Sequence, residues 1–212
     1  MQMQMQMQMR KGDARMATTP KSTYHHGDLR AALLTTAMGM LERGEQFSIR
    51  AVAREAGVSP TAPYRHFPER EALESALAAQ GLRDLKADLT RDREQPGTPD
   101  ELADLGAAYV EFALRRPALF RLMFGNECDH ESEERVRAAA EVHELLATAI
   151  TRVFPDADPI DLALGGWGLV HGMACLYLDR KLVAPSVADV TTQVRASFIA
   201  VLAAKPIDSQ SN

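Results

Sequence analysis

The chain has 212 residues, a length that fits one large domain or a small domain joined to a larger one. Apolar residues make up 46% and charged residues 25%, which excludes a wholly disordered chain. The formal net charge is −5, and taken over the whole chain this mild acidity argues against a protein coated in nucleic acid or held on anionic lipid. The only two cysteines, Cys128 and Cys175, exclude a disulfide-stapled secreted scaffold.

The start of the chain is a low-complexity segment. Residues 1–10 alternate Met with Gln and lack the apolar stretch of a signal peptide. We predict a flexible tail over 1–20, because little there offsets the entropy of ordering. The alternatives are a later start codon, at Met9 or Met16, and a basic arm that contacts a partner. No apolar run approaches the roughly 20 residues that span a bilayer, so we expect no membrane contact and, by default, a cytoplasmic location.

From residue 28 onward, apolar residues recur at three- and four-residue steps, which is typical of amphipathic helices. Ser59-Pro60, Thr98-Pro99 and Asp158-Pro159 each place a capping side chain before a proline at a first helical position. Strand patterning is nearly absent. We therefore predict an all-α protein of about nine helices, with ends uncertain by two to four residues. Their expected ranges are 27–43, 48–55, 59–66, 69–92, 99–115, 117–124, 131–153, 159–181 and 187–204.

The most informative segment runs from 47 to 67, FSIRAVAREAGVSPTAPYRHF. Its first part predicts a short helix capped by Ser48, with Ile49, Val52 and Ala53 on one apolar face. Gly57 can take the left-handed conformation that ends this helix, and a second helix is expected to follow at once. Two short helices joined by a tight glycine turn are typical of a helix-turn-helix unit.

The second helix of this unit carries polar donors over about two turns, a composition that suits a helix laid into the major groove of DNA. The stretch AVAREAGVSPTAPYRHFPEREAL resembles the N-terminal domain of TetR-family transcriptional repressors, and the resemblance runs from about Tyr24 to Leu73. Pro63 departs from the family, which usually has Leu there. Because proline lacks a backbone donor, we expect a tighter turn and an altered angle for Tyr64.

The resemblance implies a set of DNA-binding residues. Thr61, Ala62 and Tyr64 are expected to face base edges, and Arg65 to face either bases or phosphates. A basic approach arm, including His25 and His26, is expected along the backbone or in the minor groove. The full DNA-binding set is Ser48, Arg50, Ser59, Thr61, Ala62, Tyr64, Arg65, His66, Arg70, Lys21 and Tyr24. The alternative is a helical hairpin whose polar face merely meets water.

The net charge differs between the expected DNA-binding part and the rest of the chain. Residues 1–70 carry a net charge of +4 and residues 71–212 a net charge of −9. Positive charge is therefore concentrated around the expected groove-binding helix. We predict a DNA-binding domain over 21–70, an effector-binding and dimerisation domain over 71–204, and a C-terminal tail over 205–212.

The larger half has no nucleophile elbow, phosphate loop, dinucleotide fingerprint or zinc-protease motif, so we expect no enzyme and no cofactor. Residues 160–178 are apolar on almost every face, and such a helix must be covered both by the core of its own chain and by another surface. We predict a homodimer built from the last two helices and their symmetry mates. Two recognition helices would then lie roughly 34–36 Å apart and bind a pseudo-palindromic operator.

Trp167, His171 and Gly172 resemble the WHG-type C-terminal domain of a subset of TetR-family proteins. The resemblance implies a small-molecule effector that enters a pocket in this half and releases the DNA. The candidate lining residues are Tyr109, Phe112, Met123, Phe124, Trp167, His171 and Cys175, of which most are expected to be plain core.

Two groups of titratable residues leave alternatives open. His171 is a buried imidazole bonded to a neighbour, a polar anchor for the effector, or a metal ligand together with Cys175. Cys128 and His130 suggest a metal loop, but a solvated acidic turn at a helix start is favoured, so we expect no metal site.

The sequence therefore predicts a one-component repressor that binds double-stranded DNA as a dimer and is released by a small molecule. Two other classes stay open. The first is a DNA-binding regulator without a small ligand, controlled by a protein partner or constitutive. The second is a helical enzyme with a vestigial helix-turn-helix unit.

Overall fold

A computed structural model of the chain describes residues 26–46, 48–125 and 132–203. These ranges hold eight α-helices and one short 3₁₀ helix, η1, and no strand. The all-α prediction is confirmed, with a helix count close to the expected one. In chain order the elements are α1 (His26–Glu42), α2 (Ile49–Glu55), η1 (Pro63–Arg65), α3 (Arg70–Thr90), α4 (Pro99–Arg115), α5 (Pro117–Gly125), α6 (Glu133–Val153), α7 (Pro159–Leu178) and α8 (Val187–Ala203).

Capping side chains determine where several of the helices begin. The Thr98 hydroxyl accepts a hydrogen bond from the Glu101 amide at 3.2 Å, and the Glu101 carboxylate accepts one from the Gly97 amide at 2.8 Å. At the start of α7, the Asp158 carboxylate accepts from the Ile160 amide at 2.8 Å. Each of these caps satisfies backbone donors that have no partner inside the helix. Both helices then begin with the expected proline.

The predicted helix over 59–66 is wrong. Only η1, of three residues, forms there, and Ser59 caps no helix; its hydroxyl lies 3.4 Å from that of Thr61. The cause is Pro63, since it has no backbone N–H to donate to the preceding turn. The amides of His66 and Phe67 both donate to the Pro63 carbonyl at 2.9 Å, which closes the tighter turn that Pro63 predicts.

Two predicted helices also end earlier than expected. The predicted range 69–92 ends at residue 90 and the range 159–181 ends at residue 178. Asp92 and Arg180 lie just past these ends with φ of 53° and 56°, and a left-handed residue stops a helix. The amide of Lys181 turns back onto the Leu176 carbonyl at 2.8 Å, so α7 is closed before the expected end.

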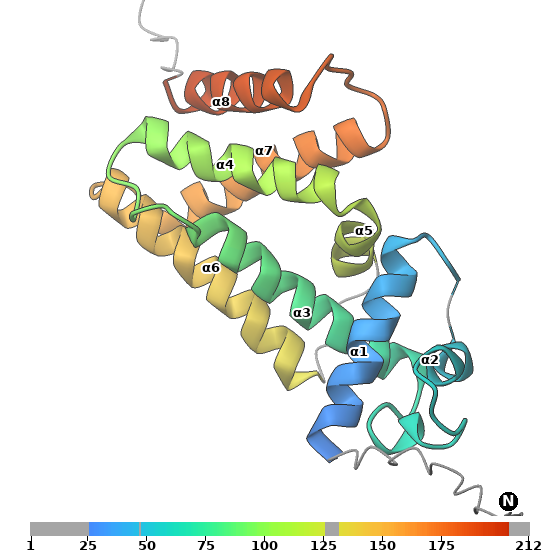
Figure 1. The fold of residues 1–212 in the computed structure, drawn as a ribbon. Helices are drawn as coiled ribbons and strands as arrows, with labels where there is room; N and C mark the ends of the chain where they lie inside the picture. The colour runs from blue at the N-terminus through green and yellow to red at the C-terminus, as the bar shows by residue number, and fades with distance from the viewer. Residues whose placement is uncertain (1–25, 47, 126–131, 204–212) are drawn as a thin grey trace, which may run out of the picture.

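One long helix connects two hydrophobic clusters. In the smaller cluster, α1 and α2 pack with the first turns of α3 around Leu33, Val52 and Leu73. Further along α3, Leu82 and Leu85 belong to the larger cluster with α4 to α8. We call α1, α2 and η1 the head and the rest of the molecule the body. Figure 1 shows the head at one end of α3 and the helices α4, α7 and α8 at the other.

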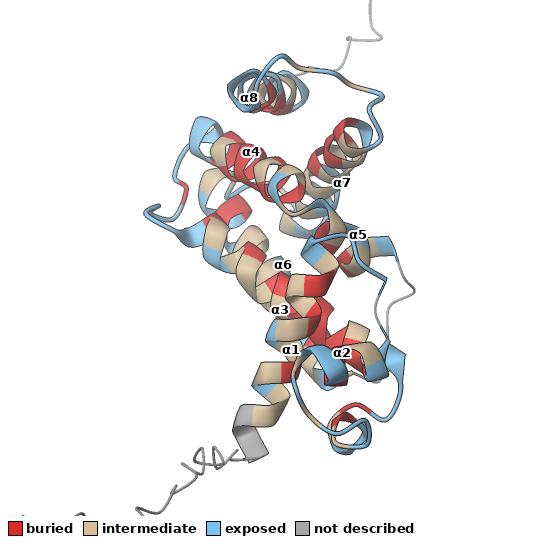
Figure 2. Ribbon diagram, turned by 45° about the vertical axis from the view of Figure 1, so that its right-hand side comes forward, coloured by how far each residue is buried: buried red, intermediate tan, exposed pale blue. Residues whose placement is uncertain are grey.

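The body is layered. Helices α3 and α6 lie side by side, α4 packs between α7 and α8, and α8 covers the end remote from the head (Figure 1). Burial is concentrated on α3 and α4, while α8 is exposed except for the side that carries Val190, Val194 and Phe198 (Figure 2). Within the described ranges, none of the helices has the length and apolar character needed to cross a bilayer.

Candidate nucleic-acid interface and ligand cavity

The first helix and the turn of the helix-turn-helix unit form as the sequence predicts. The Ser48 hydroxyl accepts from the Ala51 amide at 3.2 Å and begins α2, whose Ile49 and Val52 are buried. Gly57 has φ +69°, a conformation that glycine adopts without steric cost, and the chain reverses there. Val58 packs on the smaller cluster next to this turn.

The segment after this turn has buried side chains that fix it to the head and polar side chains that are exposed. Pro63 is fully buried and Phe67 is 2% exposed, with the Arg30 guanidinium 5.5 Å from the centre of the Phe67 ring. Tyr64 is 43% exposed. The remaining predicted contact residues in this segment are exposed at Ser59, Thr61 and Arg65 and half-buried at Ala62 and His66. The turn therefore presents its polar side chains to solvent on one surface.

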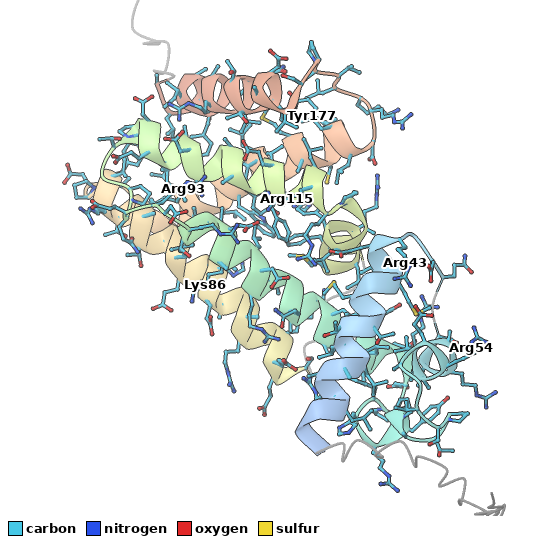
Figure 3. The ribbon with its side chains drawn as sticks, in the orientation of Figure 1. Arg43, Arg54, Lys86, Arg93, Arg115 and Tyr177 are labelled. Carbon is cyan, nitrogen blue, oxygen red and sulfur yellow. The ribbon has the colours of Figure 1, made fainter. Side chains whose placement is uncertain are left out.

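The basic side chains of the head and of the first turn of α3 differ in their hydrogen-bond partners. Arg50 and Arg54 on α2 are exposed, and Arg54 extends outward from the head (Figure 3). The Arg70 Nε donates to the Glu74 carboxylate at 2.7 Å, one helical turn further along α3. Arg43 bonds both Glu45, at 2.5 Å, and Glu55, at 3.0 Å, so its charge is balanced within the head.

Several predicted residues lie outside the described part of the chain. They are Lys21, Tyr24 and His25 of the expected approach arm, and Cys128 and His130 of the suggested metal loop. Among the described residues, no three His, Cys, Asp or Glu side chains group together as metal ligands.

The body contains a cavity of about 280 Å³ between α3, α4, α6 and α7. Its walls are almost wholly apolar, and among the described residues no carboxylate lines it. The lining residues are Leu82, Leu85, Leu89, Leu102, Leu105, Gly106, Tyr109, Met123, Phe124, Arg135, Ala139, Val142, His143, Leu145, Leu146, Gly166, Trp167, Val170 and Phe198. Pockets of this character bind small molecules.

The predicted pocket residues divide into two groups. Tyr109, Met123, Phe124 and Trp167 line the cavity together. The remaining three do not line it: Phe112 is fully buried in the core, while His171 and Cys175 lie further along α7. His171 still contacts the aromatic group, with its ring centre 4.9 Å from that of Phe124.

A chain of hydrogen bonds links two lining residues, Trp167 and Tyr109, to His171. The Trp167 Nε1–H donates to the Tyr109 hydroxyl at 3.3 Å, and that hydroxyl lies 2.8 Å from His171 Nδ1. Since indole only donates, the Tyr109 hydroxyl accepts from Trp167 and donates its own proton to Nδ1. Burial raises the pKa of the Tyr109 hydroxyl and lowers the pKa of His171, so both are held neutral.

Two polar lining residues were not predicted, Arg135 and His143 on α6. Arg135 is 7% exposed and donates from its guanidinium to the Met123 carbonyl at 3.0 Å. His143 is exposed and its ring lies 5.7 Å from that of Trp167. An arginine near a helix start is usually solvated. No local signal in the sequence indicates that Arg135 turns inward.

Ion pairs connect the head to the body beside this cavity. Glu134, adjacent to Arg135, bonds Arg30 of α1 at 2.5 Å and Arg83 of α3 at 2.9 Å. Burial raises the pKa of Glu134, but the bonds and charges of both arginines outweigh it and hold that pKa below its usual range. A second link is made by Arg116, which bonds Glu42 of α1 at 2.6 Å and Asp84 of α3 at 2.5 Å.

An apolar ridge runs along the outer side of α7. It consists of Ile160, Leu164, Gly168, Gly172 and Leu176, four residues apart in sequence. Ile160 is 74% and Leu164 is 62% exposed, and a side chain added at either glycine would meet nothing within 4 Å. Rows of residues at this spacing are the surfaces through which helices pack on one another.

The fold and these sites define an all-helical protein with a helix-turn-helix head and a body that encloses an apolar cavity. Two family matches agree with that description. Residues 33–77 match the bacterial regulatory proteins of the tetR family, and residues 102–203 match a tetracyclin repressor-like C-terminal domain. The chain belongs to the TetR family of bacterial regulatory proteins.

Individual relatives extend the comparison. A protein of unknown function from Rhodococcus sp. RHA1 has 34% sequence identity and a TM-score of 0.71, over 84% of this chain and 97% of that one. The transcriptional regulator FadR from Bacillus subtilis, solved in complex with stearoyl-CoA, shares the fold at 11% identity and a TM-score of 0.60, over 82% of this chain and 97% of that one. The nucleoid occlusion factor SlmA from Haemophilus influenzae is 29% identical over 121 residues, 55% of this chain and 56% of that relative's length.

Proposed function

We propose that this chain is a dimeric transcriptional repressor that binds an operator through its head and is released by a small molecule bound in its body. The observation that carries the effector part is the apolar cavity between α3, α4, α6 and α7. A regulator without a small ligand would favour a filled core at that place. The FadR structure also supports the proposal, because that protein of the same fold was solved with a small-molecule ligand.

The DNA-binding part rests on the exposed surface of the head. Thr61 and Tyr64 project from a segment anchored by the buried Pro63, and this suits contact with base edges. Ser48, at the start of α2, and the exposed Arg50 suit contacts with phosphates, as does Arg70 once it exchanges Glu74 for a phosphate. We propose the same division of the chain as the sequence indicates, with the first turns of α3 completing the core of the head.

The dimer is supported by the ridge on α7. A helix with Ile160 and Leu164 exposed, and with two open glycines between them and Leu176, offers another helix both apolar area and close approach. Val187 and Val201 on α8 are exposed as well and add apolar area to the body. We propose that a second copy covers this surface through a two-fold axis, because self-complementary contacts are the commonest route to a dimer.

The proposal includes no catalytic step. Trp167, Tyr109 and His171 are hydrogen-bonded in series, and Tyr109 and His171 are held neutral. A helical enzyme would instead turn over a ligand, so chemical change of a bound molecule by the purified protein would contradict the proposal.

Titration of the purified protein against the DNA upstream of its own gene tests the function. We expect saturable binding that resists excess unrelated duplex, with one dimer for each site. Failure of the folded dimer to bind any upstream segment even at low salt would contradict the proposal. Stoichiometric binding by an Arg50→Ala, Thr61→Ala double variant would contradict the proposed DNA-binding surface.

A further inference from the structure

We infer that the effector is an uncharged molecule of hydrocarbon character, with about nine non-hydrogen atoms, that lies along the cavity between α3 and α6. This inference rests on the proposed function, since it names the chemical class of the ligand in the same cavity. It is carried by three features of the cavity: an apolar end, polar groups that already have partners, and a limited volume.

The end of the cavity remote from the head is apolar. The head lies at the start of α3, whereas the cavity extends toward the other end of this helix (Figure 1). The described side chains that line this remote end are Leu85, Leu89, Leu102, Leu105, Leu145 and Leu146. They offer no hydrogen-bond partner, so a polar group placed against them loses its water without replacement. Hydrocarbon surface is instead stabilised by leaving water there.

The polar groups inside the cavity already have partners. Trp167 donates to the Tyr109 hydroxyl at 3.3 Å, and that hydroxyl lies 2.8 Å from His171 Nδ1. The Arg135 guanidinium donates to the Met123 carbonyl at 3.0 Å, and Arg135 makes a further interaction besides. An anionic ligand would have to displace bonds that the fold already uses, and each partner left without its bond would be costly in this buried place.

The opening of the cavity lies along its side and not at one of its ends. His143 is the exposed polar residue of the described lining and marks this opening, with its ring 5.7 Å from that of Trp167. On α6, the lining residue Ala139 precedes His143 and Leu146 follows it. A chain laid along α6 therefore has both ends inside the cavity, where a charged end loses its water. Since the described lining contains no acid, an ammonium group finds no ion-pair partner there either.

The volume limits the size of the ligand. The cavity measures about 280 Å³. At ~30 Å³ for each water-sized group, it holds about nine such groups, and a methylene takes a similar volume. A straight chain of about eight carbons with one hydroxyl group has this size. The probes below are chosen to match it.

Three probes of equal chain length test the chemical class: 1-octanol, octanoate and octylammonium. Trp167 is the single tryptophan and lines the cavity, so its fluorescence reports occupancy without DNA. We expect saturable binding of 1-octanol at a concentration at least about tenfold below that needed for either ion. Binding of octanoate or octylammonium as tight as that of 1-octanol would overturn the inference, as would the absence of saturable binding by 1-octanol.

A series of alcohols tests the size. From 1-hexanol to 1-octanol, each added methylene is expected to tighten binding about fourfold, because each one buries further apolar surface in the cavity. Beyond 1-decanol we expect no further gain, because the cavity is then full. A gain that continues unchanged through 1-dodecanol would overturn the inferred size.

Two variants of α6 locate the bound molecule. Ala139→Leu places additional carbon in the cavity and is expected to weaken 1-octanol by at least about tenfold. Ala140→Leu makes the same change at the next residue, which is exposed and does not line the cavity, and should leave the binding unchanged. Equal effects of the two variants would place the alcohol elsewhere. Circular dichroism verifies that each variant is folded, and the three probes on the unaltered protein decide the class if Ala139→Leu does not fold.

Operator titrations separate this inference from the proposed function. Release of operator by octanoate but not by 1-octanol would overturn the inferred class and leave the repressor function standing. Binding of 1-octanol by a protein that binds no operator would leave the ligand class standing and contradict the repressor. We expect 1-octanol to release the operator over the same concentrations that change the Trp167 fluorescence.

Discussion

Glu134 at the start of α6 bonds Arg30 of α1 at 2.5 Å, and this ion pair joins the body to the head one residue away from the cavity. The same carboxylate bonds Arg83 of α3 at 2.9 Å. All three side chains are more than a third exposed, so each pair stabilises the fold only modestly, by about 0.2–1 kcal/mol. The pair is therefore more important for coupling the two parts than for holding the molecule together.

Glu134→Gln is expected to reduce the coupling between ligand and DNA. The variant loses the charge that holds α1 to α6, so a change at Arg135 is transmitted less to the head. We expect the ratio of operator affinities without and with ligand to fall by about fivefold or more, within the range typical of allosteric coupling. The ratio is measured by fluorescence anisotropy of labelled operator.

Glu141→Gln provides the matched control. Glu141 lies on the same helix and bonds Lys86 of α3 at 2.9 Å, with similar exposure and no ion pair to the head among the described residues (Figure 3). Its removal is expected to leave the ratio of affinities unchanged. An equal fall in both variants would mean that Glu134 stabilises α6 generally and does not couple the two parts.

Arg50→Gln is expected to weaken binding to all DNA sequences alike. Arg50 is exposed at the start of α2, where phosphates are the expected partners. Removal of one phosphate-binding charge lowers the slope of log affinity against log salt by about 1 for each subunit. Arg121→Gln removes the same charge from the body, where Arg121 bonds Asp179 at 2.8 Å, and should not alter the slope. A change in sequence preference by Arg50→Gln would place this residue on a base instead.

The sequence predicts the head well where the signal is local. The cap at Ser48, the turn at Gly57 and the tighter turn at Pro63 follow from side chains and backbone preferences within a few residues. The error over 59–66 also has a local cause, since the resemblance to a family with a full helix outweighed Pro63 in the same segment. The balancing of Arg43 by Glu55, twelve residues away, depends on tertiary contact and was not predicted.

Acidification is expected to destabilise the protein through His171. Burial lowers the folded pKa of His171 below its ordinary value of 6.5, so the unfolded chain binds the proton more readily. This stability contribution is complete above pH 6.5 and is lost as the pH falls toward the folded pKa. The carboxylates with shifted pKa values act in a lower window, below 4.5.

Urea unfolding between pH 7 and pH 5 measures this effect. The His171→Gln variant keeps an acceptor for the Tyr109 hydroxyl but cannot titrate, so the fall in unfolding free energy should be smaller than in the unaltered protein. His143→Gln, at an exposed position, should retain the full fall. A variant at His171 with the same pH dependence as the unaltered protein would show that burial does not control this group.

The cavity was only half predictable. Aromatic and soft residues at helical spacing identified Tyr109, Met123, Phe124 and Trp167. Arg135 could not be identified, because its burial depends on the Met123 carbonyl, brought from α5 by the fold. The direction in which Phe112 points depends likewise on how α4 packs, and it packs this residue into the core.

Leu164→Glu is expected to convert the dimer into a monomer. Leu164 is 62% exposed on the apolar ridge of α7, and a carboxylate there would be buried without a partner in the dimer. Sedimentation velocity measures the change in mass, and operator affinity should fall with it. Val136→Glu, at a 43% exposed position on α6, is the matched control. A dimeric Leu164→Glu variant would place the interface elsewhere.

Selection of bound sequences from a random library of DNA duplexes tests whether the protein binds DNA as a dimer, because a symmetric site requires both the DNA-binding head and the dimer. We expect enrichment of an inverted repeat whose half-site centres lie about 10 base pairs apart, or a small multiple of that distance. Thr61→Val should change the preferred base at the same position of both half-sites. Enrichment of no sequence, or of a single half-site by a folded dimer, would contradict the account.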